Sequence, residues 1–132
     1  MTANSTDISV CARMSELPRL IHALAEDARK LGISEDIGLR LQLVVEELFT
    51  NTVAHGFGGD DDSTVDCRIT EAPSGVLLRY TDSAPAYDIN GTPDRTASEE
   101  LIGGLGITLI RGFSQHVHYT RTNDQNVCEI LI

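Results

Sequence analysis

The chain has 132 residues, of which 41% are hydrophobic and 23% charged, and its formal net charge at pH 7 is −10. This composition is typical of one globular domain that closes a hydrophobic core without help from a metal or a disulfide. Lys30 is the single lysine and no basic run occurs. We therefore expect neither nucleic acid nor an anionic membrane surface as a partner.

Two further features concern the cellular compartment. No apolar run approaches the roughly 18 residues of a membrane span, and the polar N-terminus shows no secretion signal. The cysteines Cys11, Cys67 and Cys128 have no metal-type spacing and leave one unpaired. They are typical of buried thiols in a reducing compartment, so the sequence predicts a cytoplasmic protein.

The first half of the chain predicts one strand and two helices. Apolar residues alternate across residues 7–13, which favours a strand. Ser15 is a suitable N-cap for a helix that Gly32 ends. Ser34 caps a second helix, which continues to His55 and ends at Gly56.

The second half predicts strands around a long connection. Residues 64–70 and 75–82 read as two strands, and residues 116–122 and 127–132 as two more, turning at "NDQN". Residues 83–104 are too long for a plain connection and favour a lid or binding loop, followed by a third helix near Gly106. We expect residues 1–132 to form a single α+β domain, a two-layer sandwich with a mixed, mainly antiparallel sheet covered on one face by helices.

The second helix carries three evenly spaced polar residues. At about 100° per residue, its core face gathers five residues, while Glu46 points to solvent. That core set is Leu41, Val44, Val45, Leu48 and Thr52. Glu47, Asn51 and His55 form an i, i+4, i+8 row that drifts from the flank towards the core edge. Such a row is either a polar boundary stripe or the border of a cleft.

If the row borders a cleft, its residue types limit the chemistry that the cleft can perform. No nucleophile is paired with His55 by local spacing, so a catalytic triad is not expected. One amide and one carboxylate make a weak all-protein metal cage. They suit a magnesium ion that keeps its waters and also binds phosphates.

Two other segments carry possible ligand chemistry. In "GGLGITLI", Gly103, Gly104 and Gly106 precede a helical pattern, where exposed N–H groups attract phosphate, although a plain glycine hinge has the same appearance. Neither a βαβ dinucleotide unit nor a Gly-Lys-Ser/Thr loop is present. Asp82 ends a predicted strand, where its carboxylate either accepts a hydrogen bond from an exocyclic amine or caps the turn.

The combined order of these pieces resembles a known family. A helix ending in E-x-x-x-N-x-x-x-H, a strand followed by D-x-x-x-P, and a long loop closing on G-G-x-G resemble the GHKL (histidine-kinase-like, Bergerat-fold) ATPases. Within them the chain looks like the bacterial anti-sigma-factor serine-protein kinases. The resemblance runs from about Ser34 to the C-terminus.

The resemblance implies a role for each matching residue. Glu47 looks like the general base and Asn51 like the Mg ligand, with ATP phosphates completing the metal site. Asp82 looks like the acceptor of the adenine amino group. The other residues that match nucleotide-site positions are His55, Ala84, Gly103, Gly104 and Gly106.

The implied activity is that of an ATP-dependent protein serine/threonine kinase with cofactors ATP and Mg. It would phosphorylate a STAS-domain anti-anti-sigma factor and hold a sigma factor or an analogous regulator, as a homodimer. The chain departs from the family's pattern at three places: Ala84 replaces a frequent glycine, Cys128 falls near a frequent threonine, and Arg95 is the only cation of the long loop.

Two alternatives remain open. The first is a non-catalytic partner-binding module that retains the ATPase fold. The second is a metal-binding protein that uses His116 and His118, which share one strand face. No cysteine joins these histidines at a metal-type spacing.

Overall fold

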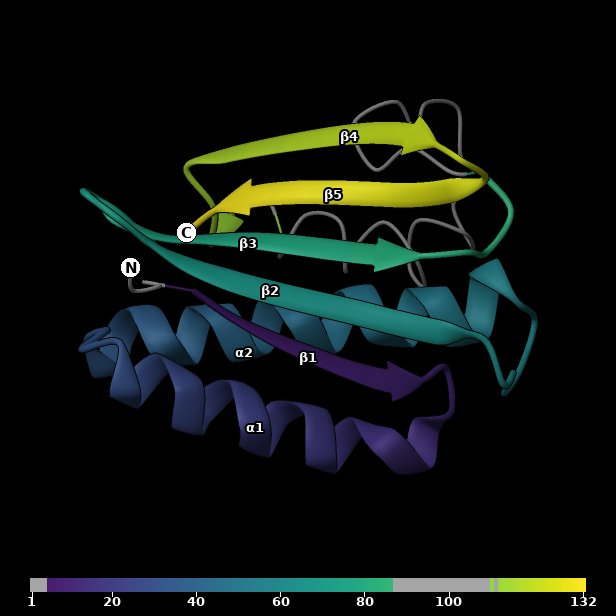
Figure 1. Cartoon of the computed structure of the whole chain (residues 1–132), viewed down its shortest axis with the longest axis horizontal. Coiled ribbons are helices and arrows are strands. Elements are labelled where there is room, and N and C mark those ends of the chain that lie inside the picture. Colours follow the sequence, from purple (N-terminus) through teal and green to yellow (C-terminus); the bar gives the residue numbers. More distant parts are fainter. Residues whose placement is uncertain (1–4, 87–109, 111) are drawn as a thin grey trace.

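A computed structural model describes residues 5–86, 110 and 112–132 of the chain. In this part of the chain a five-stranded sheet forms one layer, and helices α1 (Leu17–Lys30) and α2 (Glu35–Asn51) lie together against one of its faces (Figure 1). The predicted α+β two-layer sandwich is therefore confirmed. No helix among the described residues is long and apolar enough to span a membrane.

The sheet is antiparallel throughout the described strands. Its spatial order is β1-β2-β3-β5-β4. The strands are β1 (Ser5–Cys11), β2 (Thr64–Ala72), β3 (Gly75–Asp82), β4 (His116–Thr122) and β5 (Gln125–Leu131). Because successive side chains on a strand point to opposite faces, this register decides which residues meet the helices.

The core lies between the sheet and the two helices. Successive side chains of β2 and β3 alternate between buried and exposed or partly exposed over most of their length, as expected for a sheet with one covered face. Leu20 and Leu24 of α1 and Leu41, Val45 and Leu48 of α2 are fully buried against it. Burying one such side chain contributes about 1.5–3 kcal/mol, so both helices are held by packing more than by their own propensity.

The ends of α1 differ in part from the prediction. Ser15 does not cap this helix: a short 3₁₀ turn, η1 (Met14–Glu16), comes first, and Glu16 stands at the N-cap without a side-chain hydrogen bond. Pro18 is tolerated near the start of α1 because the first N–H groups of a helix have no partner within the helix, so its missing N–H costs no hydrogen bond. Gly32 ends the helix in the left-handed region, at φ 76°, as predicted.

Helix α2 begins as predicted and ends differently. Ser34 caps it, because its side chain accepts a hydrogen bond from the Ile37 N–H at 3.3 Å. The α-helix stops at Asn51 and continues as one π-helical turn, η2 (Thr52–Gly56), in which the Phe57 N–H donates to the Thr52 carbonyl at 2.9 Å. The wider turn changes the direction of every side chain after Asn51.

The β4–β5 hairpin is tighter than predicted. Its turn consists of Asn123 and Asp124 alone, with φ values of 51° and 61°, the pattern of a two-residue hairpin turn that follows the twist of the sheet. Gln125 and Asn126, which the sequence places in the turn, already belong to β5. This one shift decides which β5 side chain lies next to Asp82.

Candidate functional site

The site lies where the last turn of the α2–η2 helix approaches the end of β3. Both segments reach the same end of the molecule, which also carries the β4–β5 turn (Figure 1). Thr52, the first residue of η2, and Asp82, the last of β3, are both completely buried. The Thr52 hydroxyl donates to the Asp82 carboxylate at 2.8 Å and so joins the helix to the strand.

The three polar residues of the helix do not form the even row that was predicted. Glu46 is exposed, while Glu47 and Asn51 are partly buried, which confirms the predicted phase of α2. His55 is exposed and does not reach the core edge. The prediction assumed α-helical geometry as far as residue 55, whereas η2 holds one more residue per hydrogen-bonded ring and turns His55 outwards.

Asp82 is held by three protein donors. Its Oδ2 accepts from Thr52, and its Oδ1 accepts from the Ala84 N–H at 3.0 Å and from Asn126 Nδ2 at 2.8 Å. The Ala84 contact is the turn cap that Asp commonly makes at a strand end. The turn-cap role considered for Asp82 is thus present, and its role as acceptor for an exocyclic amine stays a prediction.

Tyr80 extends this buried group towards the core. Its hydroxyl lies 2.7 Å from the Thr52 hydroxyl, and the Thr52 hydroxyl also lies 3.0 Å from the Leu48 carbonyl. Threonine has one hydroxyl proton, so donation to Asp82 makes Tyr80 the donor to Thr52. The three side chains then form a continuous hydrogen-bond chain that ends on the carboxylate.

Asn126 is the site residue that sequence reasoning missed. It faces Asp82 across β3 and β5 and is only 1% exposed. Cys128, which the resemblance put near this place, pairs instead with Tyr80. The "NDQN" stretch favours a turn by composition, and only the pairing of β5 with β3 shows that its last residue is in a strand.

Ala84 packs closely on the end of the helix. A Cβ atom added to Gly56 would lie 2.8 Å from the Ala84 Cβ, closer than real Cβ contacts come. Gly56 therefore lets the helix end and the segment after Asp82 approach each other.

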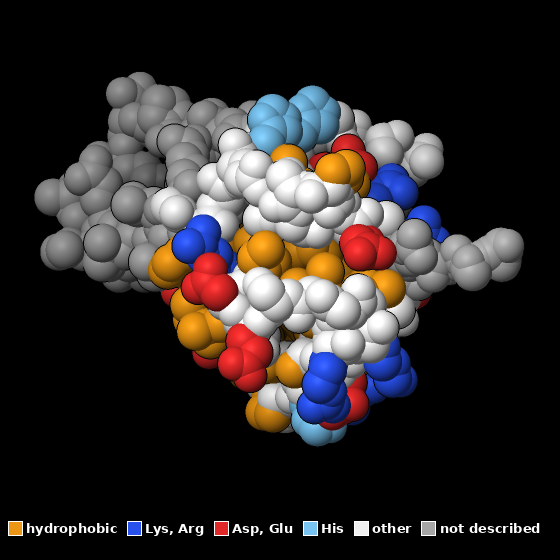
Figure 2. Space-filling view, turned by 90° about the vertical axis from the view of Figure 1, so that its left-hand side faces the viewer, with side chains coloured by type: hydrophobic (Ala, Val, Ile, Leu, Met, Phe, Trp, Pro, Cys, Tyr) orange, Lys and Arg blue, Asp and Glu red, His pale blue; other side chains and the backbone are white. Residues whose placement is uncertain are grey.

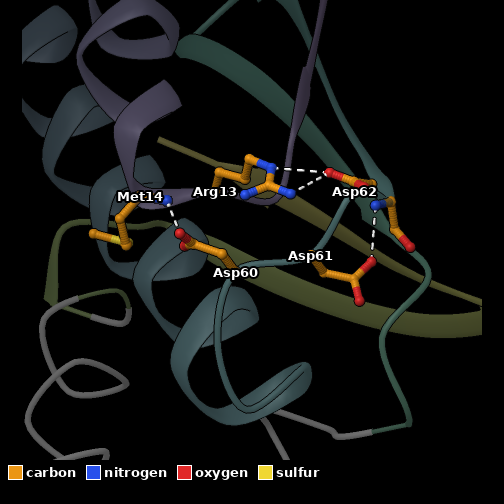
Figure 3. Close-up of polar contacts among 6 residues, drawn as sticks. Arg13, Met14, Asp60, Asp61 and Asp62 are labelled. Atoms are coloured by element: carbon orange, nitrogen blue, oxygen red, sulfur yellow. Dashed lines mark hydrogen bonds and ion pairs between the residues drawn. The ribbon is translucent and has the colours of Figure 1, made fainter.

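The loop after η2 is tied to the start of α1. Figure 3 shows three successive aspartates contacting three other residues: Met14 N–H donates to Asp60 Oδ1 at 3.0 Å, Arg13 Nε to Asp62 Oδ1 at 2.9 Å, and Ser63 N–H to Asp61 Oδ1 at 2.8 Å. Hydrogen bonds from Ser63, first from its side chain and then from its backbone N–H, lower the pKa of Asp61. The loop that follows the helix is thereby tied to the segment that leads into α1.

The histidines of β4 lie away from this site. Figure 2 shows a pair of histidine side chains side by side on the surface, and the rings of His116 and His118 are stacked with centroids 6.5 Å apart. No group of three or more His, Cys, Asp or Glu side chains that could hold a metal occurs within residues 5–86 and 112–132. The metal-binding alternative gains no third ligand there.

The cysteines are all free. Cys11 is exposed, whereas Cys67 and Cys128 are buried. Burial raises the pKa of the Cys67 thiol far above its usual range, and the nearby Asp66 carboxylate raises it further. Cys67 is therefore an inert core thiol at neutral pH.

Several predicted site residues fall outside the described part of the chain. These are Gly103, Gly104 and Gly106, with Arg95 of the long connection. The predicted third helix lies there too, apart from residues 110 and 112, which are helical. Their roles stay predictions.

Comparisons with known proteins agree with this fold. The sequence profile of the histidine kinase-like ATPase domain matches residues 10–131. Serine-protein kinase RsbW of Listeria monocytogenes serotype 4a is 27% identical over 96 residues, and the match covers 67% of this chain and 61% of that relative. RsbW of Listeria innocua is 26% identical over the same length. The chain thus spans about three fifths of the length of these relatives.

Two solved structures share the fold. The RsbU and RsbW domains of a Mycobacterium tuberculosis protein match with a TM-score of 0.68 at 12% identity, covering 96% of this chain and 31% of that one. The SiaB–SiaC complex of Pseudomonas aeruginosa matches with a TM-score of 0.68 at 14% identity, covering 96% and 87%. With the family profile matched over nearly the whole sequence, the chain belongs to the histidine kinase-like ATPase family.

Proposed function

We propose that this protein binds magnesium–ATP and transfers the γ-phosphoryl group to a serine of a STAS-type antagonist protein. The observation that supports this most is the bond between Thr52 and Asp82, which brings the acceptor Asp82 to the helix that carries Glu47 and Asn51. The similarity to serine-protein kinases supports the same reaction. The transfer needs one carboxylate that binds the base, here Asp82 of β3, and one that lies near the phosphates, here Glu47 of the adjoining helix α2.

Each side chain has a distinct part in this proposal. Asp82 accepts from the adenine 6-amino group through the acceptor capacity that its protein contacts leave. Glu47 accepts the serine hydroxyl proton while the serine oxygen bonds to the γ-phosphorus and the bond to the β-phosphate oxygen breaks, with ADP as the leaving group. Gly103, Gly104 and Gly106 offer backbone N–H groups to the phosphates. His55 and Ala84 border the nucleotide.

The donor set fits a magnesium ion that relies on its ligands from ATP and water. The Asn51 amide oxygen and the Glu47 carboxylate are hard oxygen donors on one side of α2, and both side chains are partly exposed. Asn51 is the residue that would hold the ion, whose role when bound is to neutralise phosphate charge. Two protein oxygens are too few for a closed metal cage and suit a shared one.

The partners follow from the same similarity. We propose that phosphorylation of the STAS-domain protein switches this kinase to a second partner, a sigma factor or an analogous regulator. The relative SiaB is known in a complex with SiaC, and the curated relatives are serine-protein kinases. A homodimer in the cytoplasm is part of the proposal.

A non-catalytic binding module is the second candidate, and one observation favours it. Asp82 is fully buried and already bonded to three protein donors, as a purely structural carboxylate would be. In that case the domain would bind protein partners without hydrolysing or transferring phosphate from a nucleotide. The partly exposed Glu47 favours the kinase.

One experiment separates the two candidates. The full chain is incubated with magnesium and γ-labelled ATP together with a purified STAS-domain protein from the same genome. The kinase predicts acid-stable label on a serine of that protein. Nucleotide binding without transfer to any STAS-domain protein of that genome would support the binding module, and absence of ATP binding by calorimetry would contradict the kinase.

A further inference from the structure

The buried carboxylate of Asp82 has one acceptor position left. Each carboxylate oxygen has about two lone-pair directions. On Oδ1 both are used, by the Ala84 N–H at 3.0 Å and by Asn126 Nδ2 at 2.8 Å. Oδ2 accepts only from Thr52 among the described residues, at 2.8 Å. A ligand amine would therefore meet Asp82 at Oδ2.

The orientation of the Asn126 amide is determined by its neighbours. Its Nδ2 lies within hydrogen-bond distance of groups that only accept: Asp82 Oδ1, the Ala84 carbonyl at 3.0 Å and the Pro85 carbonyl at 3.2 Å. Its Oδ1 accepts from Arg121 Nη1 at 3.1 Å, a group that only donates. A flipped amide would oppose acceptors to acceptors and donors to donors. Asn126 therefore presents a donor to Asp82.

Neighbouring residues of β4 hold this amide in place. Arg121 is the direct cross-strand partner of Asn126, and its Nη1 also donates to the Ala84 carbonyl at 3.1 Å. The Tyr119 hydroxyl donates to Asn126 Oδ1 as well. Asn126 is only 1% exposed, so its contacts are made away from competing water. Residues of β4 and β5 thus hold both the Asp82 carboxylate and the carbonyl groups of Ala84 and Pro85.

We propose that Asn126 is a specificity-determining positioning residue for the purine base. By taking the second acceptor position of Oδ1, beside the Ala84 N–H, it holds the Asp82 carboxylate in one rotamer and leaves Oδ2 as the acceptor for the base. Such a contact suits a 6-amino group, which donates, and opposes a 6-oxo group, which accepts. This inference rests on the proposed ATP-binding function and adds the residue that makes the site select adenine.

A merely structural Asn126 would act differently. Losing a residue with only a structural role would lower the stability of the fold and weaken the binding of all nucleotides by a similar factor. Losing the positioning contact leaves Oδ1 bonded to the Ala84 N–H alone, so the carboxylate is held less firmly and the preference between bases changes. The ratio of two affinities is therefore the informative quantity.

The test compares ATP with inosine triphosphate, which carries a 6-oxo group in place of the 6-amino group. Calorimetry with magnesium gives both dissociation constants for the wild type and for Asn126→Ala. We expect the preference for ATP to fall by at least about tenfold in the variant. Ile130→Val, a change on the same strand at a fully buried core position, is the control. It should lower the unfolding midpoint and keep the wild-type ratio.

A second variant covers the case in which Asn126→Ala does not fold. Arg121 is exposed, so Arg121→Ala should fold, and it removes one bond to the Asn126 amide and one to the Ala84 carbonyl. We expect the ratio to fall by about threefold or more. A folded Asn126→Ala with the wild-type ratio would overturn the inference. So would an unchanged ratio in Arg121→Ala, if Asn126→Ala does not fold.

The wild-type measurement separates this inference from the proposed function. Binding of ATP and inosine triphosphate with equal affinity would overturn base selection through Asp82 and Asn126 and leave ATP binding intact. Failure of the wild type to bind either nucleotide would overturn the proposed function and this inference with it. A wild type that prefers ATP, with a variant that does not, supports both.

Discussion

Gly56 and Ala84 lie in such close contact that a Cβ on Gly56 would come within 2.8 Å of the Ala84 Cβ. Neither atom is the end of a flexible side chain, so the backbone of one segment must move if Gly56 gains a methyl group. The pair therefore reports directly on how the end of the helix fits the segment after Asp82. It gives a prediction that does not depend on any ligand.

Gly56→Ala should destabilise the protein by about 1–3 kcal/mol, the usual effect of overpacking a close contact. Ala84→Gly should remove the clash, so the double variant should be more stable than additivity predicts, by about 0.5 kcal/mol or more. Denaturant unfolding of the wild type, both single variants and the double variant measures this coupling. Strict additivity would mean that the two segments separate in solution.

Glu47 and Glu46 are adjacent glutamates with different surroundings, the first partly buried and the second exposed. Glu47→Gln should bind ATP normally and lose roughly 10²–10⁴-fold in phosphoryl transfer, the usual contribution of a general base. Glu46→Gln is the matched control and should change transfer by less than about threefold. Single-turnover transfer and calorimetry measure the two quantities. An inactive Glu46→Gln beside an active Glu47→Gln would contradict the proposed roles.

Asn51 should matter for nucleotide binding only when magnesium is present. Asn51→Ala removes the proposed metal ligand, so it should weaken magnesium–ATP binding by about tenfold or more, which corresponds to about 1.4 kcal/mol. In excess chelator, the variant and the wild type should bind ATP equally. Thr50→Ala, at the adjacent and partly exposed position, should leave both affinities unchanged. Equal losses with and without magnesium would assign Asn51 a role other than metal binding.

Cys67 predicts a loss of stability at alkaline pH. Burial raises the pKa of this thiol in the folded state above its unfolded value of about 8.5. Its contribution is thus fully present below about pH 8.5 and is lost as the pH rises, because only the unfolded chain then releases the proton. The expected slope from this group is about 1.4 kcal/mol per pH unit.

Chemical unfolding between about pH 8 and pH 10 tests this slope. Cys67→Ala should be less stable than the wild type at pH 8 and should lose less stability on going to pH 10. Val65→Ala, a buried position on the same strand without a titrating group, should keep the wild-type slope. Parallel curves for the wild type and Cys67→Ala would show that other groups dominate the alkaline transition.

Local chemistry made much of the fold predictable from the sequence. Gly32 and Ser34 mark a helix end and a helix start because one adopts φ > 0 and the other caps with its hydroxyl, and both effects act within a few residues. The exposure of Glu46 and the burial of Leu48 follow from the helical period in the same way. Ser15 does not cap α1 because it lies inside a short 3₁₀ turn, Met14–Glu16, that precedes the helix.

The contacts that make the site depend on residues far apart in the chain. Thr52 and Asp82 are 30 positions apart and Asp82 and Asn126 are 44, so no local pattern predicts that they touch. The outward direction of His55 depends on a single π-helical turn that a regular helical period cannot show. Sequence reasoning could thus identify Glu47 and Asp82 as candidates and could not find the asparagine between the strands.

The two-residue turn at Asn123 and Asp124 has a consequence for how this family varies. Because side chains alternate along a strand, one residue inserted in that turn would shift the pairing register of β5 with β4 or β3 by one position. A different side chain would then lie beside Asp82. If Asp82 contacts the base as proposed, we expect relatives with a longer hairpin to differ in base preference even where their helix motif is unchanged. Under the proposed base contact, the length of this hairpin determines which side chain positions Asp82, so insertions there should be rarer than in the neighbouring loops.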